Sequence, residues 1–307
     1  MSLPDYRYPD KAPGPRSLIS ICMAWSLRTL PTLSEDQFSQ WGKLLEERTG
    51  IQLVFQQKAW LESQMSSRMR ELGFEDYDHY YLYVTHGLEG KLEWTRLIDR
   101  IAVKETSFFR HRDSIEYVRQ YLQNKINNQT LHNSFDVWSL GCATGEEPYS
   151  LAMVINDCFE LAMLDPYYGI TAMDISSSAL AAGRKARYSK RRIEQIKPEE
   201  IKRYMHQCAD GSFEVVGKLR DRVCFTQANI IHARQLPHVK VDVIFCQNLL
   251  VYFRRWLRRD VLNALIDRLK PGGLLVVGLG ETVDWEHPLM QRTTDDQVQA
   301  YIRAEQE

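Results

Sequence analysis

The chain has 307 residues, and at roughly 150 residues per domain this length predicts about two domains, each large enough for its own core. Hydrophobic residues make up 44% and charged residues 26%, a globular composition that excludes wholesale disorder. Since 39 Lys and Arg residues face 40 Asp and Glu residues, the net charge is −1, which excludes a global positive field for nucleic acid.

No apolar run approaches the roughly 18 residues that span a bilayer, so we expect no membrane insertion. The nearest run, Ser17 to Trp25, is too short, and it lacks the basic region and cleavage site of a signal peptide. The six cysteines include no C-x-x-C pair, so no metal site is predicted. Cysteines scattered through so long a chain indicate buried thiols in a reducing cytosol, and hence a cytoplasmic protein.

The N-terminal third divides into two parts. Residues 1–30 carry four prolines among mixed charges, a pattern typical of a mobile arm, with a short ordered piece expected near Ile19–Trp25. Residues 31–105 show helical periodicity and predict a small all-helical domain.

The first helix of this domain has clear start and stop signals. Ser34 and Gln37 fit a capping box, Leu33 and Phe38 fit the accompanying hydrophobic staple, and Gly50 is a suitable stop. Three more helices are expected at Gln57–Leu72, Tyr77–Thr85 and Lys91–Ile101.

After the helical domain the pattern changes to short apolar runs that alternate with helical stretches. Strands are predicted at Phe135–Gly141, Tyr167–Asp174, Val241–Asn248 and Leu274–Leu279. Helices are predicted at Glu146–Phe159, Ser176–Arg187 and Arg254–Leu269, the last one stopped by the stretch KPGG at 270–273. Such alternation indicates an α/β fold with a parallel sheet covered on both faces.

One region interrupts this alternation. Between about residues 189 and 228, a charged stretch leads into two short polar–apolar pieces, Ser212–Val216 and Arg222–Thr226. We interpret this region as a small antiparallel β-insertion in the α/β domain.

The residues after each strand decide the chemistry, because open parallel sheets bind ligands at the carboxyl ends of their strands. The first strand is followed by GCATGEEP, from Gly141 to Pro148. Its glycines permit close approach of the backbone to a ligand, and the helix N-terminus favours an anion. An ordinary strand–helix turn is the alternative interpretation.

Asp174 ends the next predicted strand, about 30 residues after the glycine loop, the spacing at which dinucleotide folds place a ribose-binding carboxylate. The alternative is that Asp174 only caps the helix beginning near Ser176. The two features together favour ribose binding. The absence of G-x-G-x-x-G and of a P-loop argues against NAD and against a P-loop nucleotide.

Three stretches in this order carry a family resemblance: ETSFFRH at 105–111, GCATGEEPYS at 141–150 and FCQNLLVYF at 245–253. Together they resemble the CheR-type chemotaxis receptor methyltransferases, over roughly Ser34 to the C-terminus. The resemblance implies a class I methyltransferase fold over residues 106–307 with a β-subdomain at about 189–228. It also implies transfer of a methyl group from S-adenosylmethionine to glutamates of a methyl-accepting chemoreceptor.

The same resemblance implies roles for individual residues. Arg110 and Tyr252 would be catalytic, Asp174 would hold the ribose, and Asn229 and Ile230 would flank the adenine. The full implied cofactor-binding set is Thr106, Arg110, Gly141, Glu147, Asp174, Asn229, Ile230, Asn248 and Leu249. Lys104 departs from the family, which commonly has Asn at that position, and the departure puts cofactor contacts there in doubt.

Isolated from these motifs, Arg110 could be a surface arginine and Tyr252 is better interpreted as a core aromatic; only the motif context reverses that order. Two basic clusters, at 184–192 and 254–259, are interpreted either as solvated helix faces or as surfaces for the acidic cytoplasmic helices of the receptor. Two other functions remain as alternatives: a cofactor-binding regulatory module without turnover, and a methyltransferase acting on a small molecule or nucleic acid.

Overall fold

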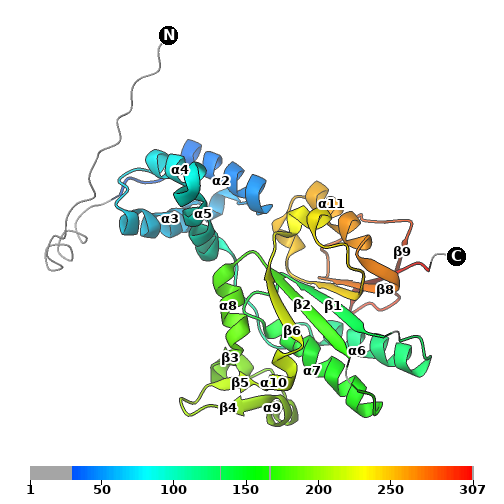
Figure 1. The fold of residues 1–307 in the computed structure, drawn as a ribbon. Coiled ribbons are helices and arrows are strands. Elements are labelled where there is room, and N and C mark those ends of the chain that lie inside the picture. Colours follow the sequence, from blue (N-terminus) through cyan, green and yellow to red (C-terminus); the bar gives the residue numbers. More distant parts are fainter. Residues whose placement is uncertain (1–29, 132, 166, 306–307) are drawn as a thin grey trace.

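The computed structural model describes residues 30–131, 133–165 and 167–305. The predicted arm, apart from its last residue, and its ordered piece at Ile19–Trp25 lie outside these residues. Figure 1 shows a helical domain beside an α/β domain that carries a small subdomain below it.

The helical domain contains four α-helices and one short 3₁₀ helix among its described residues. They are α2 (Glu35–Thr49), η1 (Phe55–Gln57), α3 (Lys58–Leu72), α4 (Tyr77–Thr85) and α5 (Gly87–Ile101). The predicted capping box is present: Ser34 Oγ accepts from Gln37 N at 3.1 Å, and Gln37 Oε1 accepts from Ser34 N at 3.1 Å. Leu33 and Phe38 are buried in one cluster, and Gly50 ends α2 with φ of 78°.

The α/β domain is built on a seven-stranded sheet in the order β6-β2-β1-β7-β8-β10-β9. Its strands are β1 (Phe135–Leu140), β2 (Tyr168–Asp174), β6 (Val223–Gln227), β7 (Val241–Cys246), β8 (Leu269–Val277), β9 (Met290–Arg292) and β10 (Gln299–Arg303). The pairs among β6, β2, β1, β7 and β8 are parallel, whereas β10 is antiparallel to both of its neighbours. The prediction of a mostly parallel α/β sheet is confirmed.

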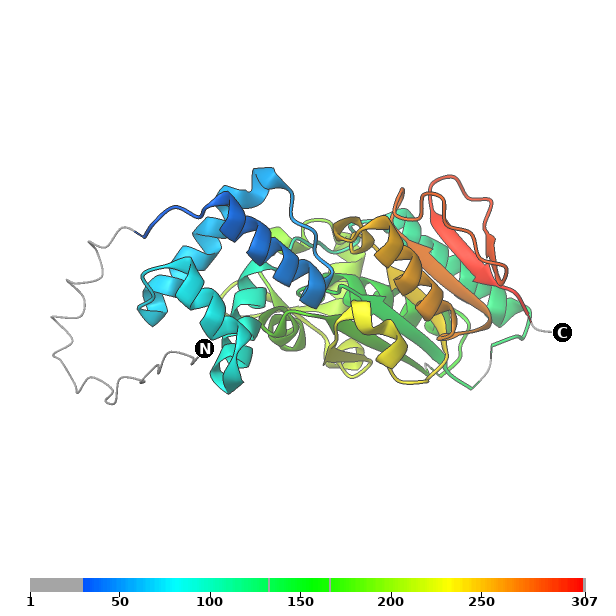
Figure 2. The same ribbon diagram turned by 90° about the horizontal axis from the view of Figure 1, so that it is seen from above.

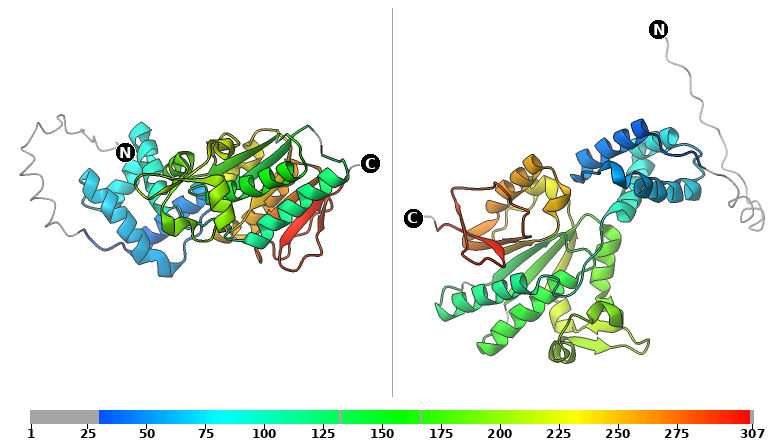
Figure 3. Two further views of the ribbon diagram at one scale, coloured as in Figure 1. Left: turned by 90° about the horizontal axis from the view of Figure 1, so that it is seen from below. Right: turned by 180° about the vertical axis from the view of Figure 1, so that it is seen from behind.

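Helices cover both faces of the sheet. Neighbouring residues of each strand point to opposite faces, so each strand contributes side chains to two buried clusters. Val137 belongs to the buried cluster beneath α6 (Arg112–Asn127) and α7 (Glu146–Leu161), while Trp138 belongs to the cluster beneath α11 (Arg255–Ile266). The 3₁₀ helices η3 (Ile230–Gln235) and η4 (Leu250–Tyr252) contribute to the α11 side. The view from below in Figure 3 shows α6 and α7 side by side on their face.

The subdomain inserted after α8 (Ser177–Lys185) has its own three-stranded antiparallel sheet. It comprises β3 (Arg187–Tyr188), η2 (Lys190–Ile193), α9 (Pro198–Tyr204), β4 (Met205–Gln207), β5 (Phe213–Val215) and α10 (Gly217–Arg220). The piece predicted at Ser212–Val216 is part of this sheet, as expected.

Two predicted boundaries are wrong. The segment at Arg222–Thr226 is not part of the insertion, because β6 pairs in parallel with β2 and forms the edge of the main sheet. The stretch 270–273 does not stop a helix: α11 ends at Ile266, and these residues bulge within β8, where Val241 pairs with Leu269 but Val243 pairs with Leu274.

The sequence patterns also left several elements unpredicted, among them α6, the short elements β3, α9, β4 and α10 of the inserted subdomain, and the C-terminal strands β9 and β10. Five cysteines lie in the described residues and none is paired; Cys142, Cys158 and Cys246 are buried, whereas Cys208 is half-buried and Cys224 is exposed. Among residues 30–131, 133–165 and 167–305, every helix is too short or too polar to cross a membrane.

Candidate functional site

A pocket lies between the helical domain and the carboxyl ends of β1, β2 and β7. Its lining contains all ten residues that the sequence singled out: Thr106, Arg110, Gly141, Glu147, Asp174, Asn229, Ile230, Asn248, Leu249 and Tyr252. The fold therefore brings together residues separated by more than a hundred positions in the chain.

The turn after β1 requires residues that tolerate positive φ. Gly141 has φ of 73°, and a Cβ there would come within 3.3 Å of Leu249 Cδ1. Its N–H donates to Met173 O at 2.8 Å, which ties the turn to the end of β2. Ala143, with φ of 45°, directs its N–H at Asp174 Oδ2, at 2.9 Å. The turn thus presents bare backbone to the pocket.

Asp174 is fixed by this turn and by the start of α8. Its Oδ1 accepts from Ser176 N at 2.8 Å. Burial raises the pKa of Asp174, although the hydrogen bonds from the Ser176 and Ala143 backbone counteract part of that effect. Ser176, not Asp174, caps α8, with Oγ accepting from Ala179 N at 3.1 Å. A carboxylate oxygen has two lone pairs, so Asp174 keeps acceptor capacity toward the pocket.

Two adjacent glutamates after the turn point in different directions. The fully buried Glu146 binds Thr144 Oγ1 at 2.7 Å and pairs with Arg192 of the inserted subdomain, so it is structural. Glu147 faces the pocket and accepts from Ser139 Oγ at 2.7 Å. Its protein surroundings raise its pKa to about 8, chiefly by burial; the bond from Ser139 opposes this effect and nearby Glu281 adds to it.

The segment after β7 carries Asn248 and Tyr252 into the pocket. Asn248 adopts φ of 57°, a conformation that Asn tolerates well, and its Oδ1 lies 2.6 Å from His111 Nε2. Burial raises the pKa of the half-buried Tyr252, and the nearby Arg110 counteracts part of that effect. The exposed Arg110 donates from Nη1 to Glu105 O at 2.9 Å, a bond that leaves four of its five N–H donors for a carboxylate.

Asn229 also lines the pocket, but its amide is engaged within the protein. Nδ2 donates to Arg48 O at 2.7 Å, and Oδ1 accepts from Ile231 N at 3.3 Å. Asn229 therefore ties the end of α2 to the segment after β6. Ile230 beside it supplies a buried apolar surface.

Lys104, the departure from the family pattern, does not line the pocket. Its Nζ donates to Asp99 O and to Ser178 Oγ, the latter at 2.8 Å, so it joins the end of α5 to the start of α8. Its positive charge acts on Asp174 from outside and counteracts part of the pKa rise of that carboxyl.

Some lining residues were missed by the sequence reasoning. His111 and Gln247 belong to the stretches at 105–111 and 245–253 but were given no role, and their place in those stretches was the available signal. Gln247 is buried, and its Oε1 has no hydrogen-bond partner among the described residues. The helical domain contributes a whole wall that no motif indicated: Thr49, Ile51, Gln52, Leu53, Gln57, Trp60, Ile101 and Ala102.

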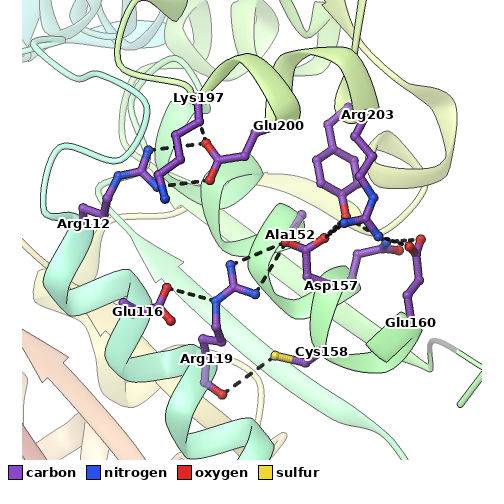
Figure 4. A network of polar contacts seen from close by, with 12 residues as sticks. Arg112, Glu116, Arg119, Ala152, Asp157, Cys158, Glu160, Lys197, Glu200 and Arg203 are labelled. Atoms are coloured by element: carbon purple, nitrogen blue, oxygen red, sulfur yellow. Dashed lines mark hydrogen bonds and ion pairs between the residues drawn. The ribbon is translucent and has the colours of Figure 1, made fainter. Parts of the chain in front are cut away.

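The inserted subdomain is anchored beside the pocket by the motif segment. Arg112 pairs with Glu200 at 3.1 Å and donates to Gln195 O at 2.9 Å, and Figure 4 shows the Arg112–Glu200 pair. Ser107, which lines the pocket, donates to Gln195 Oε1 at 3.2 Å. The subdomain and the pocket therefore share one set of contacts.

Several arginines of the two basic clusters are used inside the molecule. Arg192 pairs with Glu146, Arg184 donates to Phe225 O at 2.6 Å, and Arg254 pairs with Glu46 across the two domains. These contacts favour a structural role for those three side chains over a docking role.

The lining suits a ligand with a nucleoside end and a charged end. Asp174 and the backbone turn at Gly141 fit a ribose, Ile230 offers an apolar surface to a base, and Glu147 offers a carboxyl group that a cationic group would favour in its ionised form. Within residues 30–131, 133–165 and 167–305 no group of three or more His, Cys, Asp or Glu side chains is placed to hold a metal ion.

Comparisons with known proteins point the same way. The family model described as CheR methyltransferase, SAM binding domain, matches residues 104–299, and the model described as CheR methyltransferase, all-alpha domain, matches residues 36–102.

Two curated relatives extend over most of the chain. The chemotaxis protein methyltransferase of Borreliella burgdorferi is 29% identical over 255 residues, which cover 82% of this chain and 89% of that protein. The chemotaxis protein methyltransferase of Salmonella typhimurium is 27% identical over 252 residues, which cover 81% of this chain and 84% of that protein. A solved SAM-dependent methyltransferase from Geobacter sulfurreducens has a TM-score of 0.32 at 17% identity, covering 60% of this chain and 54% of that one.

Proposed function

This chain belongs to the CheR methyltransferase family, with S-adenosylmethionine as its cofactor, and we propose that it methylates glutamate side chains of a methyl-accepting chemoreceptor. The observation that carries this proposal is one pocket in which the protein encloses the carboxyl groups of Asp174 and Glu147, whereas Arg110 is exposed and lies near the half-buried Tyr252. That arrangement separates a place for the cofactor from a place for an incoming carboxylate.

The deep residues hold and orient the ligand. Asp174 accepts the ribose hydroxyls, and Gly141 and Leu249 lie against the nucleoside. Glu147 receives the positively charged ammonium group, which favours its ionised form. Thr106 and Asn248 contact the cofactor from the linker and from the segment after β7, and Asn229 acts by holding that side of the pocket to the helical domain.

The reaction requires no general acid–base catalysis from the protein. A glutamate has a reference pKa of about 4.3, so the acceptor is already ionised at neutral pH and needs no general base. S-adenosylmethionine supplies a methyl group activated by its positive sulfur: the carboxylate oxygen bonds to the methyl carbon as the carbon–sulfur bond breaks, and the electron pair stays on sulfur.

What the protein must contribute is position. Arg110 holds the acceptor carboxylate and Tyr252 restrains it in line with the methyl group. Oriented encounters of this kind contribute about 7–11 kcal/mol in favourable cases.

The partner in this proposal is the cytoplasmic helical domain of a chemoreceptor, which places the protein in the cytoplasm; a receptor of a pilus-linked chemosensory array fits equally. Nucleic acid is not an expected partner, since the net charge is −1. A regulatory module without turnover is the second candidate, and Lys104 is the one feature that favours it.

The test is methyl transfer to a purified receptor cytoplasmic domain, followed as base-labile methyl ester at saturating S-adenosylmethionine. We expect Arg110→Ala and Tyr252→Phe each to lower kcat by about tenfold or more, while in Tyr252→Phe the S-adenosylhomocysteine affinity changes far less. Leu161→Ser, on the exposed end of α7, is the control. Normal turnover in both variants would overturn their assignment, and no ester with the wild type would favour the regulatory module.

A further inference from the structure

Gln247 carries a buried hydrogen-bond acceptor that no group in the described part of the chain satisfies. The residue is 5% exposed and lines the pocket. Within residues 30–131, 133–165 and 167–305, five buried side-chain atoms have no hydrogen-bond partner, and Gln247 Oε1 is the one among them that belongs to the lining of this pocket. Buried polar atoms in native proteins are nearly always hydrogen-bonded, so a partner is expected here.

The orientation of the Gln247 amide follows from its neighbours. Nε2 donates to Ser114 Oγ of α6 at 2.7 Å and to Val277 O of β8 at 3.4 Å. A backbone carbonyl can only accept, so the bond to Val277 requires the nitrogen on that side of the amide. Oε1, on the other side, is therefore the atom that Gln247 can offer to a ligand in the pocket.

The sheet places Gln247 on the same side as Glu147. Ser139 and Phe245 are paired across β1 and β7, so their side chains share one face, and Ser139 Oγ donates to Glu147 Oε1 at 2.7 Å. Gln247 follows Phe245 by two residues and points to that face too, since it bonds to Ser114 of α6. Both polar groups therefore lie at the carboxyl end of the sheet on its α6 and α7 side.

This side is opposite to the one that offers a surface to the base. Ile230 packs in the cluster beneath α11, which lies over the sheet in the view from above in Figure 2, whereas α6 and α7 lie on the other face in Figure 3. With the ribose at Asp174, the amino-acid end of the cofactor extends toward Glu147. An acceptor cannot bond to the carboxylate of that end, but the ammonium group has three donors, of which a bond to Glu147 uses one.

We propose that Gln247 Oε1 accepts a hydrogen bond from the ammonium group of the bound cofactor, so that Gln247 and Glu147 together bind this group. The inference rests on the proposed function, which places the ammonium group at Glu147, and adds a residue that makes the site selective for an intact amino group. An amide suits this place, because a further carboxylate near Glu147 and Glu281 would add like charge in the ligand-free protein.

The experiment compares two ligands that differ only at the amino group. The full chain is titrated by calorimetry with S-adenosylhomocysteine and with its analogue in which hydrogen replaces the amino group. We expect the wild type to bind S-adenosylhomocysteine about 100-fold more tightly than the analogue, because a site built around a donor rejects a ligand that lacks it. Gln247→Met, which keeps the length of the side chain without the amide, is expected to lower this preference about tenfold by weakening the amino ligand.

Two variants separate the acceptor from the structural bonds of the same amide. Ser114→Ala removes a partner of Nε2 outside the pocket lining, so the preference is expected to stay within about twofold of the wild type. Gln247→Glu keeps an acceptor oxygen at the same reach, so the preference is expected to equal or exceed the wild-type value. The Tm of each variant shows whether it is folded, and Gln247→Glu gives the answer if Gln247→Met does not fold.

The outcomes separate this inference from the proposed function. Equal loss of affinity for both ligands in Gln247→Met, or a lower preference in Gln247→Glu, shows a structural role for the amide and overturns the inference alone. A preference that is lost in Glu147→Gln but unchanged in Gln247→Met does the same. A preference unchanged in both Gln247→Met and Glu147→Gln, or absent from the wild type, also overturns the place that the proposed function gives the ammonium group.

Discussion

The two walls of the pocket are built on different principles. On the sheet side, Gly141 N donates to Met173 O and Ala143 N donates to Asp174 Oδ2, so the wall is preorganised before any ligand arrives. On the other side, Trp60 and Val103 are exposed and apolar. The first wall suits one invariant ligand, whereas the second suits a partner that comes and leaves.

The end of α2 is one of the places where the two walls are joined. Gln52 N donates to Tyr252 O at 2.9 Å, and Arg48 O accepts from Asn229 at 2.7 Å. Gly50 between them packs so closely that a Cβ would lie 2.7 Å from Ile231 Cγ2. The end of α2 therefore holds the segments after β6 and β7 in place, and the helical domain is part of the pocket.

The difference between the two walls is tested most directly at Asp174, on the sheet side. Asp174→Ala removes an acceptor for the ribose and the partner of two backbone N–H groups, so we expect S-adenosylhomocysteine affinity to fall about 100-fold or more by calorimetry. Asp242→Ala, which removes a buried carboxylate paired with Lys270 outside the pocket lining, is the matched control. An affinity near the wild-type value would show that the sheet-side wall has another purpose.

Glu281 tests how the Tyr252 segment is positioned. It is buried, and it accepts from Val251 N at 3.2 Å and from Gly278 N at 2.9 Å. In Glu281→Ala we expect kcat to fall about tenfold while S-adenosylhomocysteine affinity changes less, because two backbone donors lose their acceptor and Tyr252 shifts.

Glu281→Gln keeps one acceptor oxygen and should lie between Glu281→Ala and the wild type. The exposed Glu286→Gln serves as the control for loss of charge. Equal kcat in all three variants would show that Tyr252 is held without Glu281.

Because Glu147 lines the sheet-side wall, we expect ligand affinity to depend on pH. Its pKa of about 8 in the ligand-free protein means that the carboxyl is mostly protonated at pH 7, and binding of an ammonium group ionises it. Proton release on binding makes S-adenosylhomocysteine affinity rise with pH by up to about tenfold per unit, levelling off near pH 8.

Calorimetry in buffers of different ionisation enthalpy measures this proton release, and Glu147→Gln should abolish it. In the ligand-free protein, stability changes with pH in the opposite direction to ligand affinity. The stability that protonated Glu147 contributes is lost as pH rises through about 8. A wild-type affinity independent of pH would exclude Glu147 as the partner of the ammonium group.

Lys104 carries the smallest expected effect. Lys104→Asn removes a charge that acts on Asp174 from outside the pocket, and the bond to Ser178 is solvent-exposed. We expect S-adenosylhomocysteine affinity to change by less than about threefold, as for a screened surface charge. A larger loss would give the departure from the family pattern a functional meaning and favour the regulatory module.

Much of this molecule was predictable because its signals are local. The capping box at Ser34, the left-handed stop at Gly50 and the alternation of apolar runs each involve residues within a turn or a strand of one another. The motif residues, too, were identified in the sequence, and ten of them line one pocket.

The mistakes concern non-local pairing. The short polar–apolar sequence of β6 suits a strand of the inserted subdomain as well as a strand of the main sheet. Only its pairing with β2 assigns it to the main sheet. The stretch at 270–273 has the composition of a helix stop, but the pairing of β7 with β8 makes it a bulge. Strand composition does not specify which partner a strand will find.

The sequence by itself determined the helical domain, the α/β alternation and the chemistry of the residues after β1, β2 and β7. Only the tertiary structure decided that Glu146 is structural while Glu147 faces the pocket, and that α2 closes the site. The physical reason is that burial and packing between distant segments depend on three-dimensional contacts: Glu146 is neutralised by Arg192, 46 positions away, and Asn229 bonds to Arg48, 181 positions away.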